Sequence, residues 1–233
     1  MNSDVYSPLR RAKPVPAAHV KRCRLKMKLH TLHRTSAIFV GAFACLHVAN
    51  HLASLAGIPS HIAFMEVARK LYRQPTVEFP LLLCVAFQVA SGLWLVIRGW
   101  KQRHGAVAWL QAISGAVLAF FLLVHVGAVL YGRTVLNLDT NFFFAAAGFH
   151  VPPNQFFFAP YYFLAVLALF THMGCAAYWR LHTASPRTRA VAIVLPMVVG
   201  GAVSVLLVLS LAGKLHPVEV PAKYKATYAR HEG

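Results

Sequence analysis

Four histidines of this sequence lie within or beside long apolar stretches: His47, His51, His125 and His172. An ionisable side chain at membrane depth is energetically costly, and by default it indicates a functional site. Two neutral imidazoles at equal depth on facing helices suit the axial positions of a b-type haem. The iron takes two nitrogen ligands roughly 4 Å apart, and the porphyrin takes a flat apolar slot between helices.

An internal repeat relates two of these histidines. The segment 32–37 is echoed by the segment 110–115, and the helices that follow also echo each other. The matched pairs are Ser36 with Ser114 and His47 with His125, at an offset of 78, and Gly92 with Gly174 and Arg98 with Arg180, at an offset of 82. Such a parallel repeat makes the first and third spans point the same way. We therefore expect His47 and His125 to face each other across a four-helix bundle, with the fifth span outside the repeat.

The alternative for each histidine is a hydrogen bond to a neighbouring serine or carbonyl group, which is common for single histidines in membrane helices. The matched flanking sequences favour the ligand interpretation for His47 and His125. His51 lies one turn beyond His47 on the same face and is an alternative ligand, or a hydrogen-bond donor to a haem propionate. The small residues expected to leave room for the porphyrin are Gly41, Ala42, Ala44, Gly115, Ala119 and Gly127. The histidines expected in loops or interfaces, without chemistry, are His19, His30, His61, His104, His150, His182, His216 and His231.

Five apolar stretches must position these side chains. They cover residues 35–56, 79–98, 107–131, 157–179 and 188–212. A spanning helix needs ~20 apolar residues and satisfies its own backbone polar groups, so we predict an all-α membrane protein with five transmembrane helices in a lipid bilayer. The composition agrees, because 58% of the 233 residues are hydrophobic and only 12% are charged.

The connections divide the chain further. We assign a basic N-terminal segment to 1–31, the transmembrane domain to 32–213 and a polar C-terminal tail to 214–233. The loop 57–78 should contain an interfacial helix from about 61 to 72, and the aromatic loop 132–156 should be ordered at the interface.

The 23 Lys and Arg residues, against 6 acids, gather at the ends of the chain and between spans. No basic patch with interleaved aromatic residues accompanies them, so nucleic-acid binding is not expected. Their distribution predicts a cytoplasmic N-terminus and an outer C-terminus, and we expect a bacterial inner membrane. The residues that run against this orientation are Arg69, Lys70, Arg73, Lys214, Lys223, Lys225 and Arg230.

The sequence contains no motif for a catalytic site of its own. The cysteines (Cys23, Cys45, Cys84 and Cys175) form no CxxC pair, and three of them lie in apolar stretches. They therefore indicate neither disulfides nor a thiolate metal site. No dinucleotide loop, P-loop or nucleophile elbow is present, and the first 30 residues lack the pattern of a signal peptide.

Four segments resemble the single-chain, five-helix cytochrome b anchor of succinate:quinone oxidoreductase and fumarate reductase. They are 36–43 leading to His47, 110–115 leading to His125, Gln88-Val-Ala-Ser-Gly-Leu where the family has His-x-x-x-Gly-Leu, and Phe170-Thr-His-Met-Gly. The resemblance covers about 32–180 and leaves out the N-terminal extension, the loop 132–156 and the tail.

The family holds two haems stacked across the membrane. The resemblance implies that His47 and His125 ligate the outer haem and that His172 ligates the inner one, whose second ligand position here is Gln88. Glutamine is a poor axial ligand, so one haem b is favoured over two. The resemblance further implies an electron-transfer anchor subunit rather than a stand-alone enzyme. Its partners would be membrane quinone and peripheral flavoprotein and iron–sulfur subunits docked at the basic face.

Four residues are candidates for contact with quinone: Glu66, Glu78, Arg34 and Ser36. An acid at the outer surface would exchange protons with a quinone, although a solvated glutamate at a helix start is the simpler interpretation of Glu78. His33-Arg34-x-Ser36 resembles the His-Arg-x-Thr-Gly motif of related two-chain anchors, where Ser and Arg lie near quinone. Arg34 also suits a cytoplasmic anchor of the first span.

A second function remains open from the sequence. A non-redox membrane scaffold or lipid-handling protein on the same fold is favoured by Gln88 and by the unmatched aromatic loop. A proton-coupled transporter is less compatible, because the five helices lack the broken-helix pattern of many carriers.

Overall fold

The computed structural model describes residues 17–228, and in that range it contains helices and their connections but no β-strand. Five segments are long and apolar enough to cross a membrane: Lys28–Ala56, Pro75–Gln102, Ala106–Thr134, Gln155–Arg180 and Pro186–Leu211. Their 26 to 29 residues measure ~40 Å at 1.5 Å per residue, more than the ~30 Å of a bilayer's hydrocarbon core. The chain is an integral membrane protein of the all-α class, as its sequence predicts.

The α-helices are α1 (Ala17–Ala53), α2 (Ile58–Tyr72), α3 (Pro75–Gly99), α4 (Ala106–Thr134), α5 (Phe142–Ala146), α6 (Gln155–Arg180), α7 (Pro186–Leu211) and α8 (Ala222–Lys225). Proline stands in the first turn of α2, α3 and α7, where its missing N–H costs no intrahelical bond. Ser185 caps α7 by accepting a hydrogen bond from the backbone N–H of Thr188. The expected boundary at residue 31 falls inside α1, which is one continuous helix from Ala17.

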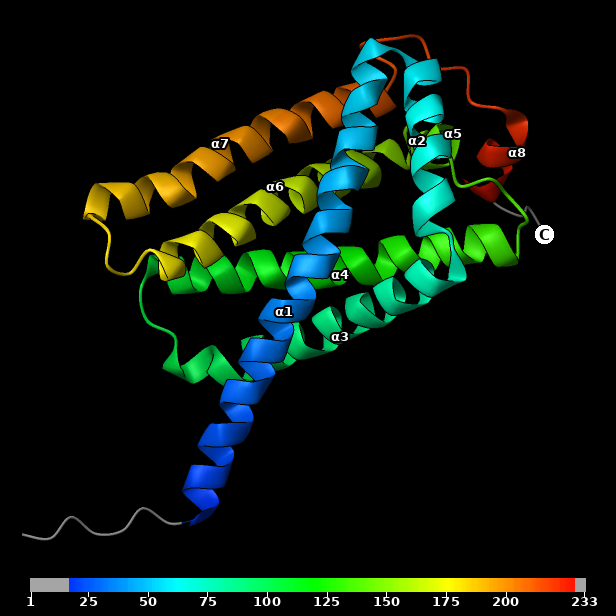
Figure 1. The fold of residues 1–233 in the computed structure, drawn as a ribbon. Helices are drawn as coiled ribbons and strands as arrows, with labels where there is room; N and C mark the ends of the chain where they lie inside the picture. Colours follow the sequence, from blue (N-terminus) through cyan, green and yellow to red (C-terminus); the bar gives the residue numbers. More distant parts are fainter. Residues whose placement is uncertain (1–16, 229–233) are drawn as a thin grey trace, which may run out of the picture.

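Four of the long helices form one layer, in the order α3, α4, α6 and α7, with each helix packed on the next. Figure 1 shows α1 crossing this layer obliquely instead of running parallel to α4. It contacts α3 and, near its C-terminal end, α7. The hydroxyls of Ser54 and Ser210, 2.6 Å apart, join the turn that follows α1 to α7. Because α1 leans on the two outer helices of the layer, space remains between α1 and the middle of the layer.

The outward faces of the long helices are apolar. Large side chains with high exposure occur on every span, among them Ile38, Phe79, Ile97, Phe120, Phe156 and Val198. A water-soluble chain would bury such side chains, whereas lipid covers them without cost. These faces therefore agree with a membrane location.

The closest helix packing is between α6 and α7, and it depends on glycine. A Cβ atom placed on Gly200 would lie 2.5 Å from Cβ of Phe170 on α6, whereas a Cβ on Gly201 would meet nothing within 4 Å. Small residues at such contacts let helix backbones approach closely in membranes. Gly200 therefore lies at the contact with α6, whereas a side chain at the adjacent Gly201 would meet no neighbour.

We expect Gly200→Ala to lower the free energy of unfolding by about 1–3 kcal/mol, because Cβ of Phe170 cannot move without moving the backbone of α6. Gly201→Ala should be neutral or stabilising by up to about 1 kcal/mol, because alanine favours the helix and meets open space. Thermal unfolding of both variants in one detergent tests this pair. A shift of the same sign and size in the two variants would contradict the packing described.

The interfacial helix expected near 61–72 is α2, and its basic residues have partners. Arg69 forms an ion pair of 2.7 Å with Asp139 and donates a hydrogen bond of 3.0 Å to the carbonyl oxygen of Thr140. Arg73 donates to the Thr140 hydroxyl at 3.1 Å. These bonds fasten α2 to the segment after α4, so two of the basic residues that run against the charge pattern have a structural role.

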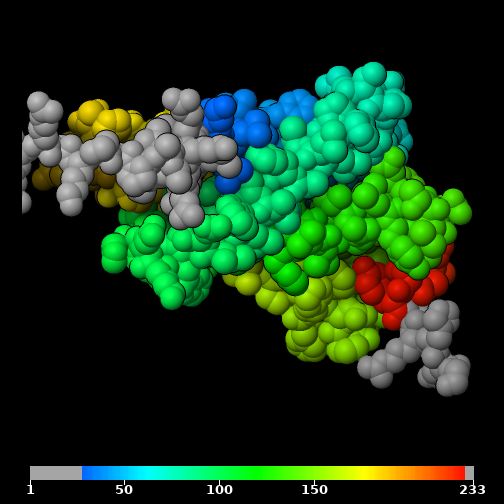
Figure 2. Space-filling model, turned by 90° about the horizontal axis from the view of Figure 1, so that it is seen from below, coloured from blue at the N-terminus to red at the C-terminus, as the bar shows by residue number. Residues whose placement is uncertain are grey.

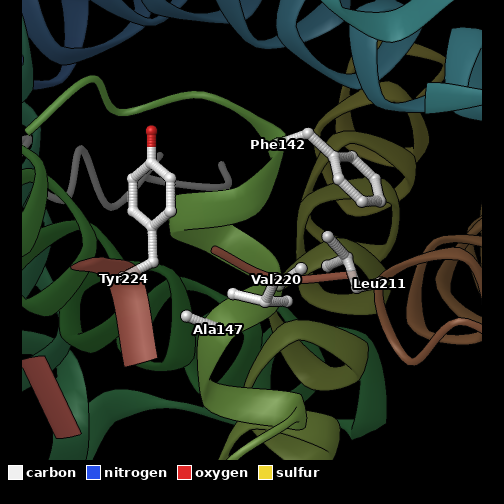
Figure 3. Packing of buried hydrophobic residues seen from close by; sticks show 6 residues of the cluster. Phe142, Ala147, Leu211, Val220 and Tyr224 are labelled. Atoms are coloured by element: carbon white, nitrogen blue, oxygen red, sulfur yellow. The ribbon is translucent and has the colours of Figure 1, made fainter. Parts of the chain in front are cut away.

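The C-terminal segment, expected to be a polar tail, packs against the aromatic loop. Six buried residues form one cluster, which Figure 3 shows: Phe142, Ala146, Ala147, Leu211, Val220 and Tyr224. In Figure 2 the red C-terminal residues lie against the green and yellow-green part of the chain. The loop 132–156 is ordered, as its sequence predicts, and the tail covers it.

Candidate functional site

A cavity of about 1770 Å³ lies between α1, α3, α4 and α6, and Leu207 and Leu211 of α7 lie at its edge. Its walls are mostly apolar. Pockets for one small ligand usually measure roughly 300–1,000 Å³, so this cavity exceeds the needs of one such molecule. Among the six small residues expected beside the ligands, those that line it are Gly41, Ala44, Gly115 and Ala119.

His47 and His125 meet across this cavity. Their ring centres lie 5.8 Å apart, although α1 and α4 carry them from opposite sides. Two axial imidazoles with metal–nitrogen bonds of roughly 2 Å place their ring centres roughly 6 Å apart. Among the described residues, neither ring makes a hydrogen bond, so nitrogen lone pairs remain for a metal. The separation therefore fits a bis-histidine haem.

The repeat reappears in the packing of these two rings. Phe43 stacks on His47 with a centre distance of 5.7 Å, and Phe121 stacks on His125 at 4.9 Å, with interplanar angles of 16° and 14°. Both phenylalanines stand four residues before their histidine, on the same helix face. Each stack restricts the orientation of an imidazole plane.

His51 extends the histidine pair toward α2. Its ring meets that of His47 at 4.8 Å and that of His61 at 5.2 Å. The ring contact of His125 with α1 is made by His47, and His51 lines the cavity beside it. The ring contact with His125 favours His47 over His51 as the ligand.

His61 is buried, although its sequence context predicts an interfacial residue. Only 2% of its surface is exposed, and its Nε2 lies 3.3 Å from the Asn50 side-chain nitrogen. Because the amide nitrogen donates, Nε2 accepts and the proton lies on Nδ1. Met65, one turn later, is buried on the same face. That four-residue spacing is the signal in the sequence for an inward-facing His61.

Burial, with further contributions from neighbouring His47 and Arg69, lowers the pKa of His61 to about 4. The unfolded chain takes up this proton near pH 6.5, whereas the folded chain does not until about pH 4. The free energy of unfolding should therefore fall as pH drops from 6.5 to 4.5. We expect His61→Gln to reduce this slope, measured by thermal unfolding in detergent, and the exposed control His104→Gln to leave it unchanged. Equal slopes for all three proteins would contradict the buried neutral state.

His172 of α6 lies against α4. Its Nδ1 is 3.1 Å from the carbonyl oxygen of Gln111 and 3.2 Å from the Ser114 hydroxyl. A carbonyl oxygen only accepts, so Nδ1 carries the proton and Nε2 keeps its lone pair. A metal-ligating histidine usually donates a hydrogen bond in this way from the ring nitrogen that does not bind the metal.

Gln88 makes the corresponding contacts on the other half of the repeat. Its amide nitrogen donates to the carbonyl oxygen of His33 and to the Ser36 hydroxyl, both at 2.6 Å. His33 and Ser36 correspond to Gln111 and Ser114 at the offset of 78. The amide nitrogen of Gln88 therefore binds α1, as Nδ1 of His172 binds α4.

The remaining candidates lie apart from the two central rings. Glu78 forms an ion pair with Arg133 of α4, and neither it nor the exposed Glu66 lines the cavity. Arg34 lines the end of the cavity that faces the basic connections, and the Ser36 hydroxyl donates to the carbonyl oxygen of Leu32. The structure thus separates the two acids from the haem candidates.

Within residues 28–228, whose side chains the structure describes, no group of three or more His, Cys, Asp or Glu side chains is arranged to hold a bare metal ion. A haem needs only two axial ligands from the protein, because the porphyrin supplies the other four. No protein-family model matches the chain, and no curated protein or solved structure is significantly similar to it. The comparisons therefore add nothing to the resemblance to the cytochrome b anchors, which is one of sequence motifs alone.

Proposed function

We propose that this protein is a membrane cytochrome that binds haem b between His47 and His125 and exchanges electrons with membrane quinone. The observation that carries the proposal is the 5.8 Å approach of the two imidazoles inside an apolar cavity. A histidine within the membrane is energetically costly and by default indicates a functional site. His47 and His125 are two such residues, and they occupy matching positions of the internal repeat.

A haem bound there would supply one-electron transfer within the membrane. The residues of the chain would hold the haem and set its redox potential. His47 and His125 would donate their nitrogen lone pairs to the iron, and Phe43 and Phe121 restrict the imidazole planes. The apolar walls exclude water, which favours the less charged form of a bound redox group.

The partners in this proposal are peripheral flavoprotein and iron–sulfur subunits. Basic residues gather at the end of the bundle formed by the C-termini of α3 and α6 and the N-terminus of α7: Arg98, Lys101, Arg103, Arg180, Arg187 and Arg189. We call this the basic end. An excess of Lys and Arg indicates the cytoplasmic side, and it would attract an acidic partner surface.

A reduced-minus-oxidised absorbance spectrum of the protein purified in detergent tests the proposal. We expect the absorbance bands of a low-spin b-type haem, and we expect a quinol to convert the oxidised haem into the reduced form. A well-folded protein without a haem spectrum, expressed with haem available, would overturn the proposal.

The alternative is a lipid-handling protein, and the size and apolar character of the cavity favour it. Under this alternative the purified protein would be colourless and would retain lipid, detectable by mass spectrometry after organic extraction. His47→Ala would then leave its lipid content unchanged.

A further inference from the structure

The basic end of the cavity brings together two other histidines, His33 of α1 and His172 of α6. Both line the cavity. Each ring lies over a glycine of the layer: a Cβ on Gly92 would be 3.5 Å from Cε1 of His33, and a Cβ on Gly115 would be 3.1 Å from Cε1 of His172. The glycines leave room for the two rings.

The two rings lie at a similar depth. Gly92 stands seven residues before the end of α3, and Gly115 stands nine residues after the start of α4. These neighbouring helices are antiparallel and joined by a short connection, so both glycines lie ~11–14 Å from the same end. The imidazoles above them therefore occupy one level of the cavity.

Both histidines also have the same protonation pattern. Nδ1 of His33 lies 2.7 Å from the Ser91 hydroxyl, whose own hydrogen goes to the carbonyl oxygen of Phe87 at 2.5 Å. The hydroxyl therefore accepts from His33, which places the proton on Nδ1. His172 donates from Nδ1 to Gln111 in the same way. In both rings Nε2 keeps a lone pair, and among the described residues it has no partner.

Cations lie at the mouth of this end of the cavity. Arg34, Arg98, Arg103 and Arg180 all line it. Nη1 of Arg103 is buried and has no hydrogen-bond partner among the described residues. A buried guanidinium nitrogen without a partner is costly, and carboxylates are its preferred acceptors. The mouth is thus suited to an anionic ligand with an apolar body.

The spacing along α1 leaves room for two separate groups. His33 and His47 are 14 residues apart, which is ~21 Å along a helix and within ~40° of the same face. The cavity of about 1770 Å³ includes both levels. One helix therefore presents one imidazole to each half of a single cavity.

We propose that His33 and His172 are the axial ligands of a second haem, whose propionates bind Arg103 at the basic end. This inference rests on the proposed function, since it extends the cofactor set of the same cavity. It replaces the expected pair of Gln88 and His172: Gln88 fastens α3 to α1, and the ligand comes from α1 itself.

The test is the ratio of haem to protein in the purified full-length chain, measured by pyridine haemochrome, together with a potentiometric titration. The wild-type protein should contain two haems per chain with two midpoint potentials. His33→Ala and His172→Ala should each reduce the ratio to one and remove the same potential. His30→Ala, one turn earlier on α1, and Gln88→Leu should retain two.

His33→Met provides a test that does not depend on loss of the cofactor. Histidine–methionine ligation raises the haem potential, so this variant should retain two haems and shift one midpoint upward. One haem per chain that is insensitive to His33 and His172 overturns this inference and leaves the proposed function standing. A protein without haem overturns both. Loss of the second haem in Gln88→Leu but not in His33→Ala would return the ligand role to Gln88.

Discussion

His47→Ala and His125→Ala are each expected to abolish binding of the haem that we propose they ligate. Each substitution would leave only one of the two proposed imidazole ligands facing the cavity. Removing a mere hydrogen-bond partner of a metal ligand already costs about 10–100-fold in affinity, so loss of the ligand itself should cost more. The measurement is the haem content and the low-spin signal in the electron paramagnetic resonance spectrum of the oxidised protein.

The neighbouring histidine supplies the control for this experiment. His51→Ala should retain the haem between His47 and His125, because the ring contact across the cavity is made by His47. Retention in His47→Ala with loss in His51→Ala would exchange the roles of these residues. His172→Ala should leave the haem of His47 and His125 in place, and equal loss in all variants would contradict two independent sites.

Much of the fold follows from local sequence features. A run of ~20 apolar residues has few alternatives to a spanning helix, since its backbone must satisfy its own hydrogen bonds in lipid. Relative positions along one helix are equally local, so the stacks of Phe43 on His47 and Phe121 on His125 follow from a spacing of four residues. The repeat links these two local patterns, and the 5.8 Å contact between the rings agrees with it.

The arrangement of His33 and His172 depends on tertiary packing instead. His33 reaches the level of His172 because α1 crosses the layer and lies on α3 near Ser91. Nothing in the apolar pattern of α1 specifies that inclination. In the sequence, Gln88 stands where the resembling family has a ligand histidine. Its side-chain amide nitrogen instead donates hydrogen bonds to His33 and Ser36 of α1, which are 55 and 52 residues away along the chain. Side chains that meet across such separations are not visible in a local pattern.

The sequence predicts a polar tail for the C-terminal segment 214–233. Lys223 and Lys225 flank Tyr224, which is only 1% exposed. Tyr224 points inward between two outward lysines and, with Val220, packs the short helix α8 against the rest of the chain. The surface that it packs against is made by α5 and the end of α7. No local sequence pattern indicates that these segments contact the C-terminal segment.

Tyr224→Ala is expected to lower the free energy of unfolding by about 3 kcal/mol, the lower end of the range for buried aromatic residues. The ring stacks on Phe143 with a centre distance of 6.3 Å and belongs to the cluster with Phe142 and Leu211. Phe142 in turn contacts His61 at 5.2 Å, so the cluster supports the end of the cavity opposite the basic end. Thermal unfolding in detergent measures the effect, and Tyr131→Ala, at a site 55% exposed, is the matched control.

Limited trypsin digestion separates local from global loss. If the tail detaches while the five spans stay folded, cleavage after Lys214, Lys223 or Lys225 should accelerate at least about tenfold, because a docking loss of 1.4 kcal/mol already corresponds to that factor. The midpoint of thermal unfolding would then fall by less than expected for a loss of about 3 kcal/mol in the free energy of global unfolding. Unchanged digestion together with an unchanged midpoint would mean that Tyr224 does not dock the tail. Faster digestion in Tyr224→Ala but not in Tyr131→Ala would locate the contribution in the cluster, because only one of the two tyrosines is enclosed by it.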